Sequence, residues 1–118
     1  MSIKELAIKY NQFQNDFGLG IDGDISSLFS PDFRKIVNGG EIVTSSSKLK
    51  EQLEGVKEFA GSWKIQEKEL IPSLDNQCCT IRYLLTSEKS GTFDIIAIMK
   101  SVNGIKIDSI DEVYYQVT

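Results

Sequence analysis

Histidine is absent from the 118-residue chain, and its absence removes much of the usual catalytic chemistry. Histidine is the commonest general base, a usual zinc ligand and the residue that activates serine or cysteine nucleophiles. We therefore predict no metal site and no cofactor. Acid–base or binding chemistry then depends on carboxylates, and on one arginine in the middle of an expected strand.

That arginine is Arg82, and two interpretations of it stay open. A covered arginine needs a partner, because burying a charge without one is costly. In the first interpretation Arg82 holds a carboxylate or an enol oxygen of a ligand with two parallel hydrogen bonds. In the second it pairs with Asp94 or Glu69 across a sheet.

Pairs of carboxylates share a face on two expected strands, Glu67 with Glu69 and Asp108 with Glu112. Alternate residues of a strand share one face. Two carboxylates in one pocket can divide the acid and base roles if their surroundings separate their pKa values. The plainer interpretation, a solvated strand surface, stays open because such residues are rarely buried.

Two short patterns resemble familiar ligand motifs but lack what those motifs require. Residues 18–23, Gly-Leu-Gly-Ile-Asp-Gly, fit the G-x-G-x-x-G pattern, but they follow an expected helix instead of a strand and so predict a flexible connector. Asp22 and Asp24 lack the further ligands and the distal glutamate of a calcium loop. Neither motif predicts a site.

Composition narrows the class of protein. The net charge is −4, the pI is about 4.8 and no basic run occurs, which predicts no nucleic-acid or membrane partner. The start of the chain has no signal-peptide pattern, and no apolar stretch has membrane-spanning length. Cys78 and Cys79 are adjacent and would point to opposite faces of a strand, so we expect free thiols and a cytoplasmic protein.

Helical patterns dominate the first half of the chain. Ser2 and Glu5 form a capping box before apolar positions at helical spacing up to Phe17. A short helix is expected near residues 25–29, after which Ser30-Pro31 restarts the chain. Strands are expected at 34–37 and 41–44, around Asn38-Gly39-Gly40. A third helix follows, with this apolar face: Leu49, Leu53, Val56, Phe59 and Ala60.

Strand patterns fill the second half, at residues 63–71, 77–87, 92–102 and 105–117. Asn103-Gly104 predicts a two-residue hairpin between the last two. Helices followed by hairpin-linked strands predict a single α+β domain over residues 1–118 with a mostly antiparallel sheet. Both faces of the central strands are apolar, and helices can cover only one of them. We therefore expect a homodimer that covers the other face.

The order of these elements resembles the nuclear transport factor 2-like superfamily, which includes SnoaL-like cyclases and ketosteroid isomerases. The passage Gly23-Asp24-Ile25 to Leu28-Phe29, followed by Ser30-Pro31-Asp32-Phe33, resembles that family's Gly-Asp, short helix and Asp-Phe passage. Residues 47–59 resemble its third helix, and residues 102–107 its final hairpin. The resemblance implies a cystatin-like cone in which helices and a curved sheet enclose a pocket, with dimerisation through the outer sheet face.

The resemblance carries over only one of the isomerase's three catalytic roles. The oxyanion-binding tyrosine falls on Tyr10, but the general-base aspartate falls near Asn38, which cannot accept a proton at neutral pH. The protonated aspartate falls near Ala97 or Ile98, which are apolar. The isomerase mechanism is therefore not expected, and neither is the histidine-dependent dehydratase mechanism.

Three hypotheses remain. The first and favoured one is a SnoaL-like domain that binds a small apolar or aromatic molecule without evident catalytic machinery. The second is a cofactor-free isomerase, cyclase or dehydratase with a carboxylate base, Asp94, Asp108 or Glu112. The third is a protein-interaction module whose cavity is filled by side chains. The expected pocket contacts are Tyr10, Trp63, Arg82, Tyr83, Asp94 and Asp108, with apolar walls from Phe29, Phe59 and Ile96.

Overall fold

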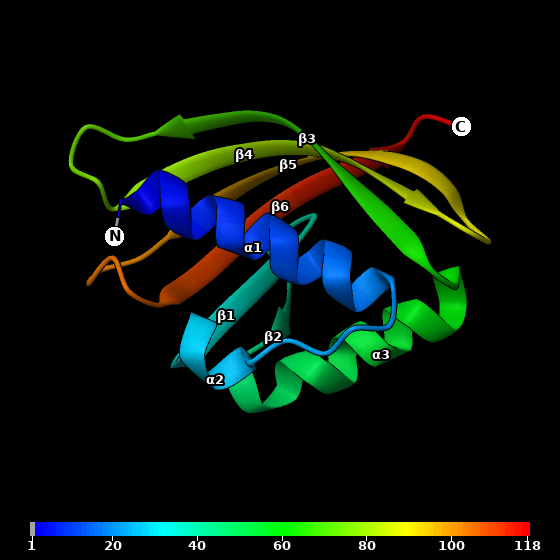
Figure 1. Cartoon of the computed structure of the whole chain (residues 1–118), viewed down its shortest axis with the longest axis horizontal. Helices are drawn as coiled ribbons and strands as arrows, with labels where there is room; N and C mark the ends of the chain where they lie inside the picture. Colours follow the sequence, from blue (N-terminus) through cyan, green and yellow to red (C-terminus); the bar gives the residue numbers. More distant parts are fainter. Residues whose placement is uncertain (1) are drawn as a thin grey trace.

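The computed structural model describes residues 2–118, in which helices pack against one face of a curved six-stranded sheet (Figure 1). The helical segments are α1 (Ile3–Gly18), α2 (Ile25–Leu28), the 3-10 turn η1 (Ser46–Lys48) and α3 (Leu49–Ala60). The strands are β1 (Phe29–Val37), β2 (Gly40–Val43), β3 (Trp63–Pro72), β4 (Cys78–Ser87), β5 (Gly91–Lys100) and β6 (Ile107–Gln116). The predicted α+β class is confirmed. No helix in residues 2–118 has both the length and the apolar character needed to cross a membrane.

The strand order is β2-β1-β6-β5-β4-β3, and β1 and β6 are the only parallel neighbours in this sheet. Figure 1 shows the long strands curving over α1, with α3 on the same side of the sheet. The sheet therefore has an inner face toward the helices and an outer face away from them.

Helix α1 supplies the largest share of the helical core. The Ser2 hydroxyl accepts a hydrogen bond from the Glu5 amide at 3.1 Å, as the capping box predicts. The Asn15 side chain accepts the Ile65 amide of the edge strand β3 at 2.8 Å. The apolar side chains that α1 buries are Ile3, Leu6, Ala7, Tyr10, Phe13 and Phe17.

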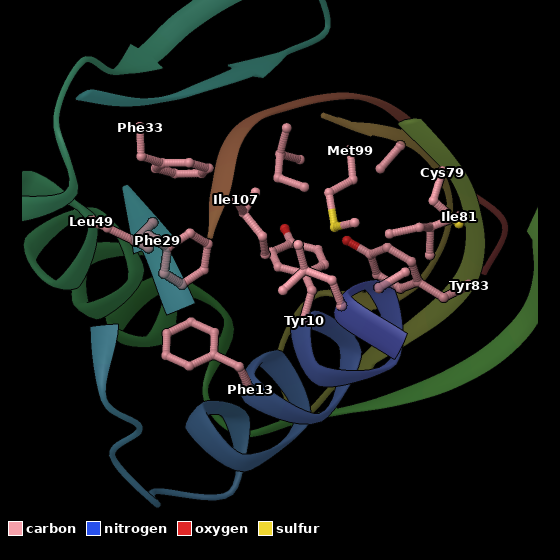
Figure 2. Packing of buried hydrophobic residues seen from close by; sticks show 14 of the residues in the cluster. Tyr10, Phe13, Phe29, Phe33, Leu49, Cys79, Ile81, Tyr83, Met99 and Ile107 are labelled. Atoms are coloured by element: carbon pink, nitrogen blue, oxygen red, sulfur yellow. The ribbon is translucent and has the colours of Figure 1, made fainter. Parts of the chain in front are cut away.

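Aromatic rings fill one end of this core. Phe29 packs edge-to-face against Phe33 at 4.7 Å and Phe13 at 5.2 Å between ring centroids. Figure 2 shows Tyr83 on the far side of the core from these rings, with its hydroxyl directed inward on the side of Tyr10. Tyr83 and Tyr10 are both at least 97% buried, so the core contains two phenol groups.

Residues 30–33 differ from the expectation of a restart after the short helix, because they belong to β1. Phe29 pairs with Ile107, and the ladder with β6 resumes only at Arg34 with Ser109. The shift leaves Pro31 where no ladder hydrogen bond is required of it, which is how a strand tolerates proline.

The predicted two-residue hairpin at Asn103-Gly104 is wrong. Strand β5 ends at Lys100 and β6 begins at Ile107, so six residues connect them. The Asn103 side chain accepts the Ile105 and Lys106 amides at 2.8 and 3.0 Å, and Ser101 accepts the Gly104 amide at 3.0 Å. These side chains satisfy backbone groups that a tight hairpin would have paired between strands.

Two residues of the expected apolar face of α3 are not buried. Leu49, Leu53 and Ala60 are buried, whereas Val56 is 37% and Phe59 78% exposed. The side of α3 that carries Val56 and Phe59 therefore does not pack tightly against the sheet, and a cavity opens there.

Candidate functional site

A cavity of about 670 Å³ lies between α3 and the inner face of the sheet. Figure 1 shows α3 at the end of the molecule where β3 begins, on the inner side of the sheet. Most of the cavity wall is hydrocarbon and aromatic. The apolar residues that line it are Val37, Ile42, Leu53, Val56, Phe59, Ala60, Trp63, Leu85, Phe93 and Ile95.

A polar cluster of Gln14, Tyr83 and Glu112 lies in this apolar wall. The Tyr83 hydroxyl lies 3.3 Å from Gln14 Oε1 and 3.2 Å from Glu112 Oε2, and it can donate its one proton to either. Gln14 and Glu112 are both 94% buried. Gln14 Nε2 is itself buried and has no hydrogen-bond partner among residues 2–118.

The tyrosines of this region stay protonated at neutral pH. Burial raises the pKa of Tyr83 well above its ordinary value near 10, and the negative charge of Glu112 raises it further. The pKa of Tyr10 is raised by the same two causes. Tyr83 is therefore a hydrogen-bond donor, not an anion, wherever the protein is folded at neutral pH.

Trp63 is fixed where β3 leaves the helical layer. Its indole Nε1 donates to the Gln14 carbonyl at 3.0 Å, and its ring stacks on Phe17 with centroids 5.9 Å apart. Gly18 packs against the same indole so closely that a Cβ there would overlap it. The indole thus forms a rigid wall of the cavity.

Lys35 and Gln52 form a second polar group at the cavity. Lys35 is 5% exposed, on the inner face of β1, and its Nζ donates to Gln52 Oε1 of α3 at 3.2 Å. No carboxylate of the described residues lies within 4 Å of this ammonium. The cavity therefore contains a buried cation and, in Glu112, a buried anion.

The structure does not bring the six sequence-predicted pocket residues together. Trp63 and Tyr83 line the cavity, and Tyr10 lies in the adjoining core. Arg82 lies on the outer face because neighbours on a strand point to opposite sides. There it pairs with Asp94 through hydrogen bonds of 3.2 and 2.8 Å, which is the second of the two interpretations given above.

Of the remaining predicted positions, only Phe59 lines the cavity. Asp108 accepts the Val102 amide at 2.7 Å and stabilises the loop between β5 and β6. Phe29 is in the core, Ile96 is on the outer face, and Phe59 does line the cavity, at an exposed position. Glu67 and Glu69 do not share a face, because a register shift between them turns Glu69 outward to pair with Arg82 in the ladder.

Sequence reasoning missed Gln14, Lys35 and Gln52. A signal existed for the first two. Gln14 follows Tyr10 by four positions on the apolar face of α1, and Lys35 alternates with Phe33 and Val37 along β1. A polar residue in an apolar stripe is the informative exception. Gln52 borders the apolar face of α3, and its pattern gives no comparable signal.

No family model matches the chain, and no curated protein matches it by sequence. Solved structures resemble it closely in shape. An NTF2-like protein of unknown function from Exiguobacterium sp. 255-15 superposes with a TM-score of 0.74 at 19% identity, covering 95% of this chain and 99% of that one. A candidate polyketide cyclase from Streptomyces antibioticus gives a TM-score of 0.74 at 9% identity, with 97% and 92% covered.

A third similar structure is a candidate SnoaL-like isomerase from Agrobacterium tumefaciens, with a TM-score of 0.72 at 10% identity and 94% and 95% covered. These likenesses give the chain the NTF2-like fold, as the resemblance in its sequence implied. A designed protein with a curved β-sheet also matches, with a TM-score of 0.59 at 20% identity and 94% and 97% covered. Function must therefore be argued from the cavity and not from the fold.

Proposed function

We propose that the chain binds a small, largely apolar molecule in the cavity between α3 and the sheet. One observation carries the proposal: a cavity of about 670 Å³ whose apolar walls converge on Gln14, Tyr83 and Glu112. Ligand sites commonly have volumes of about 300–1,000 Å³, with a few polar groups that fix orientation. The third hypothesis, a cavity filled by side chains, is not favoured at this volume.

The hydrogen-bonding groups of the polar cluster indicate which functional groups the ligand carries. The Tyr83 hydroxyl can donate its proton to a carbonyl or ether oxygen of the ligand in place of Gln14 or Glu112. Glu112 can accept from a hydroxyl or an N–H group of the ligand. Flat aromatic walls at Trp63 and Phe93 favour a ring system as the apolar body.

Similar structures agree with this class of ligand. They include candidate polyketide cyclases from Streptomyces antibioticus and Sinorhizobium meliloti, whose names imply a small organic substrate. At 9% and 12% identity these likenesses concern the fold, so the ligand of this chain is inferred from its own residues.

A second candidate function is an acid–base step on the same ligand, because Glu112 is a buried carboxylate within the cavity. A carbon acid next to a ligand carbonyl would lose its proton to Glu112. The electron pair would move onto the carbonyl oxygen, which the Tyr83 hydroxyl would hold by a hydrogen bond. Deuterium exchange into a bound ketone, lost in Glu112→Gln while binding persists, is the result this candidate requires.

Trp63 provides the test of binding, because it is the only tryptophan and it lines the cavity. N-phenyl-1-naphthylamine, a neutral aromatic probe, accepts energy from tryptophan. We expect a saturable rise in probe emission on excitation of Trp63, with one probe bound per chain.

The matched variants are Val56→Phe and Val56→Ala, at a partly exposed position that lines the cavity. A phenylalanine there occupies cavity volume and should weaken probe binding about tenfold, whereas alanine should leave it within about twofold. Equal binding by the two variants, or emission that rises without saturation, would contradict a site in this cavity.

A further inference from the structure

We infer that the ligand of this cavity carries an acidic group and that Lys35 binds it. The inference rests on the proposed function and specifies the charge of the ligand. It begins from the position of Lys35, whose side chain lines the cavity and is 95% buried.

The surroundings of Lys35 leave its charge without a direct partner. Its ladder neighbours are Val43 on β2 and Ile110 on β6, and both are buried and apolar. Its Nζ makes one hydrogen bond, to the neutral side chain of Gln52. An ammonium has three N–H donors, so two of them remain for a ligand. A buried ammonium is costly unless it is paired, which makes an anion the expected partner.

Glu112 does not take that role in this structure. It lies on β6 beside Val37, two positions along β1 from Lys35, and it is more than 4 Å from the ammonium. Its hydrogen-bond partner is the Tyr83 hydroxyl at 3.2 Å. Glu112 therefore offsets the charge of Lys35 at a distance, while the donors of Lys35 stay available to an acceptor in the cavity.

Lys35 and the apolar walls together indicate a ligand that is apolar and carries a carboxylate, a sulfonate or a similar singly charged acid. The acid would accept charge-assisted hydrogen bonds from Lys35, next to Gln52. The apolar body would lie against Leu53 and Trp63, and a neutral polar group would reach Tyr83.

Two probes with the same apolar body test the inference. 8-Anilinonaphthalene-1-sulfonate and N-phenyl-1-naphthylamine differ only in the sulfonate, and both fluoresce when bound in an apolar site. Dissociation constants for both would be measured with the wild-type protein, Lys35→Met, Lys35→Gln and Lys64→Met. Lys64 is exposed on β3 and does not line the cavity, so its variant controls for the loss of one positive charge.

We expect the wild-type protein to prefer the sulfonate. Both Lys35 variants should bind the sulfonate about tenfold more weakly and leave the affinity for the neutral probe unchanged. Unchanged binding of the neutral probe also shows that the variants fold. Lys64→Met should match the wild type, and Glu112→Gln should bind the sulfonate more tightly because a nearby negative charge is removed.

The alternatives are distinguishable. Equal sulfonate affinity in wild type and Lys35→Met overturns the role of Lys35, as does an equal loss in Lys64→Met. Binding of the neutral probe but not the sulfonate overturns the acidic ligand and leaves the proposed function intact. Saturable binding of neither probe overturns the proposed function, and this inference with it.

Discussion

A single residue, Tyr83, belongs both to the core of the protein and to the lining of its cavity. Its hydroxyl is shared between Gln14 and Glu112, and its ring is packed in the core. Removing the hydroxyl leaves the buried Glu112 carboxylate without this donor. We predict that Tyr83→Phe lowers the free energy of unfolding by about 1–3 kcal/mol, measured by urea denaturation at pH 7. A variant as stable as the wild type would show that the Tyr83 hydroxyl contributes nothing to the folded state.

The raised pKa values of Tyr10 and Tyr83 predict a loss of stability in alkali. Both groups bind their proton more tightly in the folded state than in the unfolded state, where the pKa is near 10. Their contribution is complete below pH 10 and is lost as the pH rises toward the folded-state pKa, by about 1.4 kcal/mol per pH unit for each group.

The same titration separates the two tyrosines. Unfolding free energies measured from about pH 8 to about pH 11, a range that brackets the ordinary tyrosine pKa near 10, should fall less steeply in Tyr83→Phe than in wild type. Tyr115→Phe removes a hydroxyl from the exposed outer face and is the control for losing one tyrosine. Identical slopes for wild type and Tyr83→Phe would contradict the assignment.

The sequence identified only some of the pocket residues. Successive residues of a strand point to opposite faces of the sheet, and the sequence alone does not say which face lines the cavity. Tyr83 and Arg82 are adjacent, so only one of them can line the cavity, and the residue pattern of β4 does not say which. The sequence did place Trp63 and Tyr83 among the candidates. It could not place Lys35 at a cavity, since the gap between α3 and the sheet depends on how the helix packs.

Alanine substitutions at two helical glycines test how α1 and α3 pack against their surroundings. A Cβ at Gly55 in α3 would meet no atom within 4 Å, while one at Gly18 in α1 would overlap the Trp63 indole and carbonyl. Alanine is a better helix former than glycine by up to about 1 kcal/mol. The same substitution should therefore have opposite effects at the two positions.

We predict that Gly55→Ala raises the free energy of unfolding by about 0.5–1 kcal/mol. Gly18→Ala should lower it by about 1–3 kcal/mol, because the Trp63 wall must move. Thermal and urea denaturation of the two variants measure both effects. Destabilisation by Gly55→Ala would mean that α3 packs more closely than described.

Helix and strand locations were predictable because each carries a local pattern. The capping box starts α1, and alternation marks the long strands. The connection between β5 and β6 was not predictable from Asn103-Gly104 alone. There the side chains of Ser101 and Asn103 stabilise a wider loop, and the dipeptide rule does not include such bonds.

At the scale of the whole molecule, the outer sheet face remains uncovered by helices. Ile96, Ile98 and Val113 are between 43% and 54% exposed there, around the Arg82–Asp94 ion pair. We propose that a second copy of the chain covers this face, as the apolar pattern of both strand faces predicts.

Sedimentation velocity tests the dimer. Wild-type protein should sediment as a dimer at micromolar concentration, and Ile96→Glu as a monomer because it places a charge in the interface. Leu74→Glu, in the exposed turn between β3 and β4, is the matched control and should stay dimeric. A monomeric wild type would contradict the proposal, as would a dimeric Ile96→Glu.

The most direct test of the central claim is a ¹H–¹⁵N spectrum of the protein titrated with N-phenyl-1-naphthylamine. The indole N–H of Trp63 gives one signal, because the chain has one tryptophan. We predict saturable shifts of that signal and of the Ala60 and Ile95 amides, which belong to residues that line the cavity. Shifts confined to outer-face residues such as Ile96 and Val113, or no saturable shift at all, would contradict a ligand-binding cavity.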